Sequence, residues 1–405
     1  MSAVEIQYPE TEEEIARIVS EASASGQPIA ISGGGTKLGL GRPVQAASAL
    51  SVAKLTGITN YDPSELVMAA RAGTPLAEIE AALAVNNQML TFEPMDYRPL
   101  LGASGEPTIG GVFAGNVSGP RRISAGAARD NLLGVRFVNG SGEIIKSGGR
   151  VMKNVTGLDL VKLLAGSWGT LGVLSEVIFK VLPKPETSLT IGVSGLNDAE
   201  AAEAMAAALA MSVEVSGAAH LPESVVGKVA GGSLTGGPAT VLRLEGLKPS
   251  VEVRSERLVA EMGRRGTVSV IDGQASADLW RDIRDVKPFA GASTKPVWRV
   301  SVAPSAGHQL VAALRLKTGV DAYYDWQGGL VWLQMEADPE AGLVRQYIKA
   351  LGGGHATLVR ADAATRAAVP VFEPQPAPLE ALSRRIKDQF DPNGILNPGR
   401  MTAGV

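Results

Sequence analysis

Near the start of the chain, apolar positions recur with the spacing of one helix face. Thr11 and Glu14 form a capping box, which marks a helix start, and Gly26 is typical of a helix end. The apolar positions between these two signals are Ile15, Ile18, Val19 and Ala22. The pattern therefore predicts an amphipathic helix between Thr11 and Gly26.

From there to residue 185, short apolar runs alternate with glycine-rich turns. The runs that predict strands are 28–32, 66–72, 134–138, 143–145 and 173–182. A second helix is predicted with Thr74 as its cap and Pro75 as its first residue. Its expected buried face consists of Leu76, Ile79 and Leu83. Because Pro183-Lys184-Pro185 interrupts the pattern, we place a domain boundary after residue 185.

A different pattern fills residues 186–377. Strand-like and helix-like runs are mixed there, at 189–193, 199–210, 240–244, 251–262, 298–302, 330–334 and 340–351. They predict an α+β domain whose helices cover one face of a sheet. Residues 378–405 form a third segment, a helix followed by a turn, with apolar helix positions at Leu379, Leu382, Ile386 and Phe390. More than one domain is expected for a chain of 405 residues.

Composition excludes several classes of protein. The net charge is −3, and no cluster of Lys and Arg is long enough to follow a phosphate backbone, so no nucleic-acid partner is expected. The sequence has no cysteine, which excludes disulfides, thiolate catalysis, iron–sulfur ligation and cysteinyl flavin. The histidines, His220, His308 and His355, lie far apart in the sequence, and we predict no metal site.

The sequence also bears on location. The N-terminus has neither a basic start nor an apolar run, so no signal peptide is expected. No stretch approaches the roughly 18 apolar residues that a membrane-spanning helix needs. We therefore expect a cytoplasmic protein.

The glycine run Gly33-Gly34-Gly35 is the first candidate for ligand binding. Consecutive glycines let backbone N–H groups turn inward together, which forms a nest for an anion. A Rossmann pattern that starts at Gly33 fails because Leu38 stands where the last glycine belongs. A P-loop that starts at Gly34 fails because Leu40 stands where lysine is required. By itself the run predicts either a cofactor loop or a tight turn.

A second glycine-rich segment, Thr108–Arg122, strengthens the case for a cofactor. Small residues at 110, 111, 114, 115, 118 and 119 predict a channel lined by backbone, along which a long flat ligand can lie. Thr108, Asn116 and Ser118 supply polar groups beside it. Arg121 and Arg122 are expected to screen its phosphates. The alternative is a loop crossing whose small residues serve packing alone.

A third segment, Gly149–Val173, completes a family pattern. Gly33-Gly-Gly-Thr36, Thr108-Ile-Gly-Gly111 and Gly169-Thr-Leu-Gly-Val173, in this order, resemble the FAD-binding domain of the vanillyl-alcohol-oxidase/p-cresol-methylhydroxylase (PCMH) family. The end of the chain, from Phe390 to Arg400, is similar to the usual end of that family. The resemblance covers about residues 5–185 and 378–401. Within the family, Ser118-Gly-Pro-Arg-Arg122 and the segment 151–157 look like the FAD-binding (E-type) subunits of bacterial glycolate oxidase.

The resemblance implies a fold, a cofactor and a set of binding residues. The fold is α+β: a PCMH-type FAD-binding domain of two subdomains (1–185), an α+β cap domain (186–377) and a C-terminal helix that returns to the FAD domain (378–405). In the family the first glycine loop holds the FAD diphosphate and the other segments flank the cofactor. The cofactor-binding residues that this implies are Ser32, Gly33, Gly34, Gly35, Thr36, Lys37, Leu38, Thr108, Gly110, Gly111, Ala114, Gly115, Ser118, Gly172, Val173, Leu174 and Asn397.

Two departures from the family pattern change the expectations. The chain has no cysteine and no histidine before His220, so noncovalent FAD is predicted. The catalytic D-type subunit of glycolate oxidase carries a His-x-Gly-Asp-Gly-Asn motif in its cap, and nothing in this sequence matches it. Oxidation of a hydroxy acid needs a base and cations, and His355 with Arg360 is the candidate catalytic pair in the cap. A strand-connecting turn beside an ordinary histidine is the alternative.

Two functions follow from the resemblance. The first is an FAD-binding subunit of a glycolate oxidase or dehydrogenase complex, in electron transfer or assembly. Its expected partners are a catalytic FAD-linked subunit and an iron–sulfur subunit, through which it would meet the inner membrane. The second is an autonomous FAD-dependent oxidoreductase that acts on a small 2-hydroxy acid. A UDP-sugar enolpyruvyl reductase on the same fold fits less well, because the cap here is longer and differently patterned.

Overall fold

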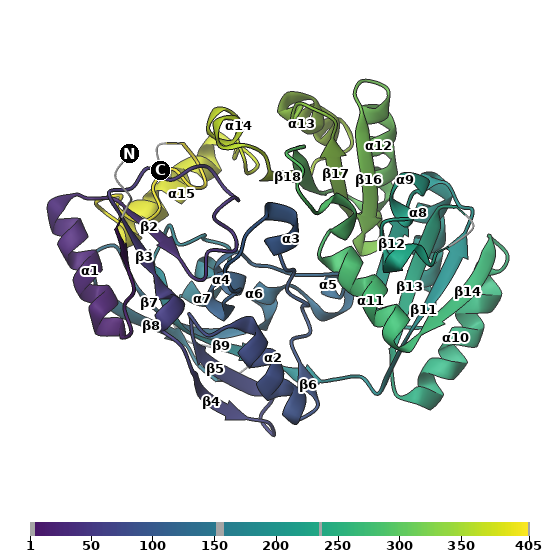
Figure 1. The fold of residues 1–405 in the computed structure, drawn as a ribbon, viewed down its shortest axis with the longest axis horizontal. Helices are drawn as coiled ribbons and strands as arrows, with labels where there is room; N and C mark the ends of the chain where they lie inside the picture. Colours follow the sequence, from purple (N-terminus) through teal and green to yellow (C-terminus); the bar gives the residue numbers. More distant parts are fainter. Residues whose placement is uncertain (1–4, 151–157, 235–236, 404–405) are drawn as a thin grey trace.

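The computed structural model describes residues 5–150, 158–234 and 237–403, which form two lobes side by side (Figure 1). The 151–157 segment, part of the family resemblance, lies outside the described residues. Helix α1 (Glu12–Ser25) has the predicted ends, because the Thr11 side chain accepts the N–H of Glu14 and Gly26 adopts a left-handed φ of 62°. Its buried residues are the predicted Ile15, Ile18, Val19 and Ala22.

The first lobe contains two larger sheets. A three-stranded parallel sheet has the order β1-β3-β2, with β1 (Ile6–Gln7), β3 (Ser48–Ser51) and β2 (Ile29–Ser32). A five-stranded antiparallel sheet has the order β4 (Ile58–Asp62), β5 (Val67–Arg71), β9 (Val173–Lys180), β7 (Leu132–Val138) and β8 (Ile144–Gly148). A short pair joins β6 (Gln88–Met89) to β10 (Leu182–Pro183). The predicted strands of this region are thus present.

Helices pack between and around these sheets. They are α2 (Leu76–Val85), α3 (Arg98–Leu101), α4 (Ile109–Ala114), α5 (Arg122–Ala125), α6 (Ala128–Asn131) and α7 (Leu160–Leu164). Helix α2 buries Leu76, Ile79 and Leu83 as predicted. The predicted cap at Thr74 is wrong, because Pro75 is the N-cap and the Thr74 hydroxyl donates to the carbonyl of Arg71 at 2.7 Å.

The second lobe is built on one eight-stranded antiparallel sheet. Its order is β14 (Thr267–Asp272), β11 (Thr187–Ser194), β13 (Ala239–Gly246), β12 (Gly217–Leu221), β16 (Val320–Asp325), β17 (Leu330–Met335), β15 (Val297–Ser301) and β18 (His355–Arg360). The two halves of the sheet meet where His220 of β12 pairs with Tyr324 of β16. The α+β class predicted for this region is confirmed.

Helices cover both faces of this sheet. On one face lie α8 (Asp198–Ala210), α10 (Lys248–Met262), α12 (Gly307–Arg315) and α13 (Ala341–Ala350), while α9 (Glu223–Val226) lies near β16. Helix α11 (Gly273–Arg284) packs on the opposite face, which is turned toward the first lobe (Figure 1). The prediction of helices on one face is therefore wrong for α11. Leu279, Trp280 and Ile283 of α11 join the hydrophobic core that includes the first lobe.

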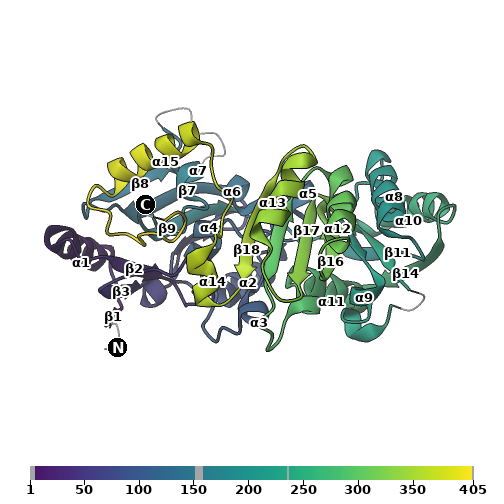
Figure 2. The same ribbon diagram turned by 90° about the horizontal axis from the view of Figure 1, so that it is seen from above.

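The end of the chain returns to the first lobe (Figure 2). After α14 (Ala363–Ala368), helix α15 (Ala377–Phe390) leads into residues 395–397, which lie against β2. Buried Lys387 anchors the helix, since its ammonium donates to the carbonyls of Thr170 (2.8 Å) and Leu396 (3.0 Å) and pairs with Asp391. Leu379 and Leu382 do not form the buried face that their spacing suggests, because they are 50% and 44% exposed.

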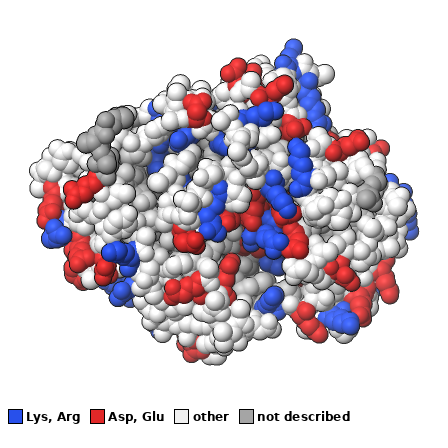
Figure 3. All heavy atoms as spheres, viewed as in Figure 1, with Lys and Arg blue, Asp and Glu red and all other residues white. Residues whose placement is uncertain are grey.

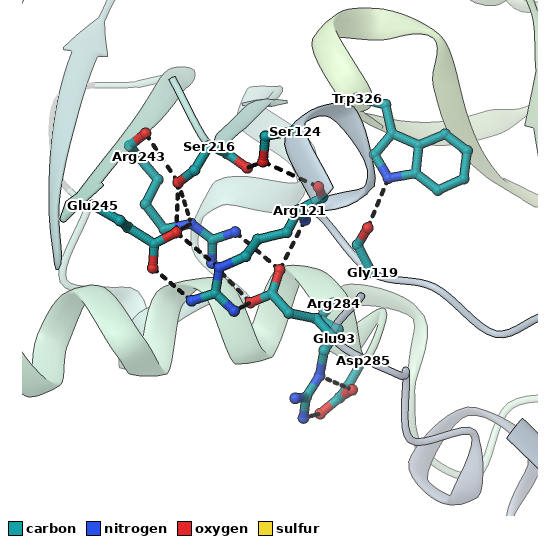
Figure 4. A network of polar contacts seen from close by, with 10 residues as sticks. All are labelled: Glu93, Gly119, Arg121, Ser124, Ser216, Arg243, Glu245, Arg284, Asp285 and Trp326. Atoms are coloured by element: carbon teal, nitrogen blue, oxygen red, sulfur yellow. Dashed lines mark hydrogen bonds and ion pairs between the residues drawn. The ribbon is translucent and has the colours of Figure 1, made fainter. Parts of the chain in front are cut away.

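A buried ionic network joins the two lobes (Figure 4). Glu93 and Arg121 belong to the first lobe, and Arg243 and Glu245 belong to β13. Arg243 binds Glu93 through two hydrogen bonds of 2.9 Å, and Arg121 donates to Glu245 at 2.8 Å and 2.5 Å. Their side chains are only 3–15% exposed. Basic and acidic side chains also meet along this junction at the molecular surface (Figure 3).

The network sets the protonation of its carboxylates. Burial raises the pKa of Glu245, but hydrogen bonds and charge from Arg121 and Arg243 outweigh burial and lower that pKa from 4.5 to about 2. The pKa of Glu93 is lowered as well, because the same two arginines outweigh its burial. Each lobe thus supplies a cation for the other lobe's anion, and the four charges compensate one another.

We expect Glu245→Gln to lower the free energy of unfolding at pH 7 by about 3–5 kcal/mol, because it leaves buried guanidinium charge uncompensated. The folded pKa of Glu245, about 2, lies below the unfolded value of 4.5, so its stabilisation is complete above pH 4.5 and is lost as the pH falls toward 2. The difference between variant and wild type should therefore shrink below pH 4.5. Thermal denaturation between pH 7 and pH 3 measures it.

The matched control is Glu21→Gln, whose exposed carboxylate pairs with Arg17 on α1. It should change stability by less than about 1 kcal/mol at every pH. Equal stability of Glu245→Gln and wild type at pH 7 would contradict the assignment of the network as the junction between the lobes.

Candidate functional site

A cavity of about 740 Å³ lies where β2 ends in the first lobe. Four segments far apart in the sequence line it: 31–38, 108–115, 167–174 and the C-terminal Arg400. The predicted cofactor-binding residues that line it are Ser32, Gly33, Gly34, Gly35, Thr36, Lys37, Leu38, Thr108, Gly110, Gly111, Ala114, Gly115, Gly172, Val173 and Leu174.

Backbone donors from the first glycine loop face this cavity. Within the described part of the chain, the N–H groups of Gly35, Thr36 and Lys37 have no hydrogen-bond acceptor. Gly35 adopts a φ of 82°, a conformation that favours glycine and turns the loop. Unpaired N–H groups in a turn of this kind bind anions. The loop therefore has the donor set that a diphosphate requires.

Two cationic side chains reinforce the anion site. Burial lowers the pKa of Lys37 to about 8, an effect that Asp96 offsets in part, and Arg400 lowers it further. Burial, followed by Arg366, lowers the pKa of Arg400 to about 10. Among the described residues, neither side chain has a carboxylate within 4 Å. The positive charge at this end of the cavity is thus free for an anionic ligand.

Close packing accounts for several of the glycines. A Cβ on Gly33 would lie 2.3 Å from the Thr108 hydroxyl, and one on Gly34 would lie 1.9 Å from the carbonyl oxygen of Glu106. A Cβ on Gly110 would lie 2.6 Å from that of Ala72. The glycine motifs therefore bring the chain segments against one another, and this packing leaves the cavity between them.

Two predicted residues do not line the cavity. Asn397 lies behind it, where its amide accepts the N–H of Ile31 at 2.8 Å and donates to the carbonyl of Trp168 at 2.8 Å. It positions two walls without facing the ligand space. Ser118 lines the neighbouring cavity, and its hydroxyl accepts the N–H of Ala128 at 2.9 Å.

Other lining residues were missed by sequence reasoning. Trp168 lines the cavity with a left-handed φ of 54°, which no sequence pattern indicates. Arg400 belongs to the C-terminal segment that carries the resemblance, and its charge was a signal that could have been used. It donates to the carbonyl of Lys37 at 3.0 Å, which ties the end of the chain to the first glycine loop.

A second cavity, of about 1010 Å³, lies between the lobes. It shares Gly115 and Trp168 with the first cavity, so the two spaces adjoin. His355 lines it, and burial, Arg299 and Arg122 lower the pKa of that imidazole. These two cavities, one inside the first lobe and one between the lobes, thus lie side by side.

The structure does not bring His355 and Arg360, the candidate catalytic pair, together in one cavity. The two residues stand at opposite ends of β18, and Arg360 does not line the second cavity. The Arg360 guanidinium donates to the carbonyls of Phe289 (2.6 Å), Lys295 (2.9 Å) and Leu100 (3.3 Å). It is therefore a buried structural group, held by backbone carbonyls rather than free for a substrate.

The phosphate-screening role expected for Arg121 and Arg122 is also wrong. Arg121 lies between Glu93 and Glu245 in the ionic network. Arg122 lines the second cavity and stacks on Trp326, with its guanidinium carbon 4.6 Å from the ring centre. The cations beside the first glycine loop are Lys37 and Arg400 instead.

Within ranges 5–150, 158–234 and 237–403, no group of three or more His, Asp or Glu is arranged to hold a metal ion. In the same ranges, no helix has both the length and the apolar character that crossing a bilayer requires.

Comparisons with known proteins agree with this geometry. A family model described as "FAD binding domain" matches residues 5–148. The solved structure of p-cresol methylhydroxylase with substrate bound superimposes with a TM-score of 0.70 at 17% identity, over 98% of this chain and 88% of that one. The fold and the site define a flavoprotein oxidoreductase with a PCMH-type FAD-binding domain.

The comparison of full sequences is more specific. Glycolate oxidase subunit GlcE of Escherichia coli (strain K12) is 35% identical over 391 residues, which cover 95% of each chain. Glycolate oxidase subunit GlcD of Bacillus subtilis (strain 168) is 33% identical over 184 residues, 45% of this chain and 38% of GlcD. The chain belongs to the family of GlcE-like glycolate oxidase subunits.

We expect Gly34→Val to reduce the FAD content of the purified protein strongly. Its side chain would collide with the Glu106 carbonyl and displace the glycine loop, and the branched group would also narrow the cavity. The matched control is Gly342→Val on the exposed start of α13, where a Cβ meets nothing within 4 Å. Flavin absorbance per mole of protein measures the effect, with circular dichroism to check the fold. Equal flavin content in the two variants would contradict the site.

Proposed function

We propose that the chain is the FAD-binding subunit of a glycolate oxidase or dehydrogenase complex. In this role it serves electron transfer or assembly beside a catalytic FAD-linked subunit and an iron–sulfur subunit. The observation that supports this is the extent of the GlcE similarity, which runs through 95% of both chains and so includes the cap. The similarity to GlcD covers only 45% of the chain. The sequence also lacks the His-x-Gly-Asp-Gly-Asn motif of the D-type subunit.

The first cavity fits the cofactor that the family implies. The unpaired N–H groups of Gly35, Thr36 and Lys37, together with the charges of Lys37 and Arg400, suit the diphosphate. The small residues of 110–115 and the wall at 172–174 leave a narrow space that suits a flat ring system. FAD supplies the ability to accept and pass on electrons when bound. The chain's own groups hold it, neutralise its phosphates and exclude water from it.

We predict that the FAD is bound noncovalently. The whole sequence lacks cysteine and has no histidine before His220, and the lining of the first cavity contains no histidine. Precipitation of the purified protein with acid should therefore release the yellow colour into the supernatant. Colour that remains in the washed pellet would contradict noncovalent attachment.

A second candidate function is an autonomous FAD-dependent oxidoreductase that acts on a small 2-hydroxy acid. One observation favours it: the second cavity adjoins the first at Gly115 and Trp168, so there is space for a substrate beside the cofactor. The two candidate functions differ in whether the isolated chain, without partner subunits, catalyses the oxidation of a 2-hydroxy acid.

For the subunit role, we expect the isolated FAD-loaded chain to reduce a dye acceptor slowly with glycolate or D-lactate. The complex formed with co-expressed partner subunits should be at least roughly tenfold faster. A tag on this chain should also recover the partner subunits from the same cells. Steady-state dye reduction, with and without the partners, provides the measurement.

The contrary result would be rapid turnover by the chain alone that disappears in His355→Ala and persists in His308→Ala. His355 lines the second cavity, whereas His308 lies on α12 away from it, so this pair separates a site effect from the loss of any histidine. That result would replace the subunit role by the autonomous enzyme.

A further inference from the structure

Two arginines in the second cavity have no carboxylate within ion-pair distance among the described residues. Arg122 comes from the first lobe and Arg299 from β15 of the second lobe. Both stack on Trp326, with guanidinium carbons 4.6 Å and 4.9 Å from the ring centre. Among the described residues, neither guanidinium makes an ion pair or donates a hydrogen bond. Their five donors each are therefore available to the cavity.

Other buried arginines nearby do have carboxylate partners. Arg121, the neighbour of Arg122 in the chain, binds Glu93 and Glu245. Arg284, which also lines the second cavity, binds Asp285 through contacts of 2.8 Å and 2.9 Å. Burial of a guanidinium without a compensating anion costs free energy. Two such groups that line one cavity therefore favour the binding of an anion there.

The groups around the arginines compensate their charge only in part. Burial raises the pKa of Asp325 to about 7, and its carboxylate accepts the N–H of Trp326 at 2.7 Å. Burial raises the pKa of the Tyr97 hydroxyl, and the pKa of His355 is lowered, so both are neutral at pH 7. With a pKa of about 7, Asp325 is about half ionised at pH 7 and offsets less than one of the two guanidinium charges, so the polar end of the cavity keeps a net positive charge.

The remaining wall indicates the kind of anion. Beyond the polar groups, the apolar side chains that line the cavity are Leu40, Met95, Val117, Leu330, Trp332, Val359, Phe372 and Met401. Such a wall suits a carbon skeleton. A planar guanidinium matches a carboxylate with two parallel hydrogen bonds.

We propose that the second cavity of this chain is a binding site for the carboxylate of a small organic acid, which Arg122 and Arg299 hold. Trp326 positions both guanidiniums, and Tyr97 and His355 face the rest of the acid. This inference deepens the proposed function and rests on it in one respect: with FAD in the first cavity, the acid lies next to the cofactor, because the cavities share Gly115 and Trp168. A subunit in this family would then sense or bind the acid itself.

Isothermal titration calorimetry of the purified full chain tests the site. The probes are glycolate, glyoxylate and D-lactate, with glycolamide as the neutral counterpart and inorganic phosphate as the alternative anion. We expect at least one carboxylate to bind and glycolamide to give no heat. Arg122→Met and Arg299→Met should each weaken that Kd roughly tenfold or more, since each removes charge-assisted hydrogen bonds. Arg299→Lys should give an intermediate Kd, because it keeps the charge without the planar donor pair.

The matched control is Arg17→Met, which removes an exposed arginine on α1 and should leave the Kd unchanged. Arg122→Met keeps the test valid if Arg299→Met fails to fold by circular dichroism, because Arg122 comes from the other lobe. An unchanged Kd in Arg122→Met, binding of glycolamide as tight as that of glycolate, or a preference for phosphate would each overturn the proposal. Failure of the protein to bind FAD would refute the proposed function, whereas the heats of carboxylate binding decide this inference separately.

Discussion

The ionic network of Glu93, Arg121, Arg243 and Glu245 is the interaction on which the two-lobed structure depends. It is buried at the junction, and each lobe supplies one cation and one anion to it. In a low-dielectric interior, four charges are stable only in an arrangement that pairs each charge with an opposite one. The network therefore fixes how the second lobe sits on the first. Because the second cavity lies at the same junction, its shape follows from that arrangement.

The role of each arginine in this protein depends on its position in the fold. Arg121 and Arg122 are adjacent in the sequence, yet Arg121 pairs with two carboxylates, whereas Arg122 lines the second cavity and makes no ion pair among the described residues. Arg360 is held by three backbone carbonyls, and Arg400 closes the anion end of the first cavity. All four residues carry the same charge, and their neighbours in space give them different roles. Arg121 joins the two lobes, Arg122 faces a ligand space, Arg360 stabilises the fold and Arg400 faces the cofactor space.

The first cavity illustrates a second principle, that cofactor space arises from backbone packing. Gly33, Gly34 and Gly110 each lie so close to another segment that a Cβ would collide with it. The motifs bring β2, the 105–108 loop and α4 together, and the space that remains is lined by small residues and free N–H groups. Asn397 and Arg400 then tie the end of the chain to the same place. Both ends of the sequence thus contribute to one site.

The sequence by itself determined the local elements and the cofactor. Helix α1 and the strands of the first lobe follow from periodicity and capping, because these signals act over a few neighbouring residues, whereas the cofactor and most residues of the first cavity follow from the resemblance of the glycine motifs to a known family. Only the tertiary structure decided which charges meet. The pairing of Arg121 with Glu245 and the convergence of Arg122 with Arg299 depend on how distant segments of the chain pack. Electrostatic partnership acts through space, and residues more than a hundred positions apart carry no local pattern that reveals it.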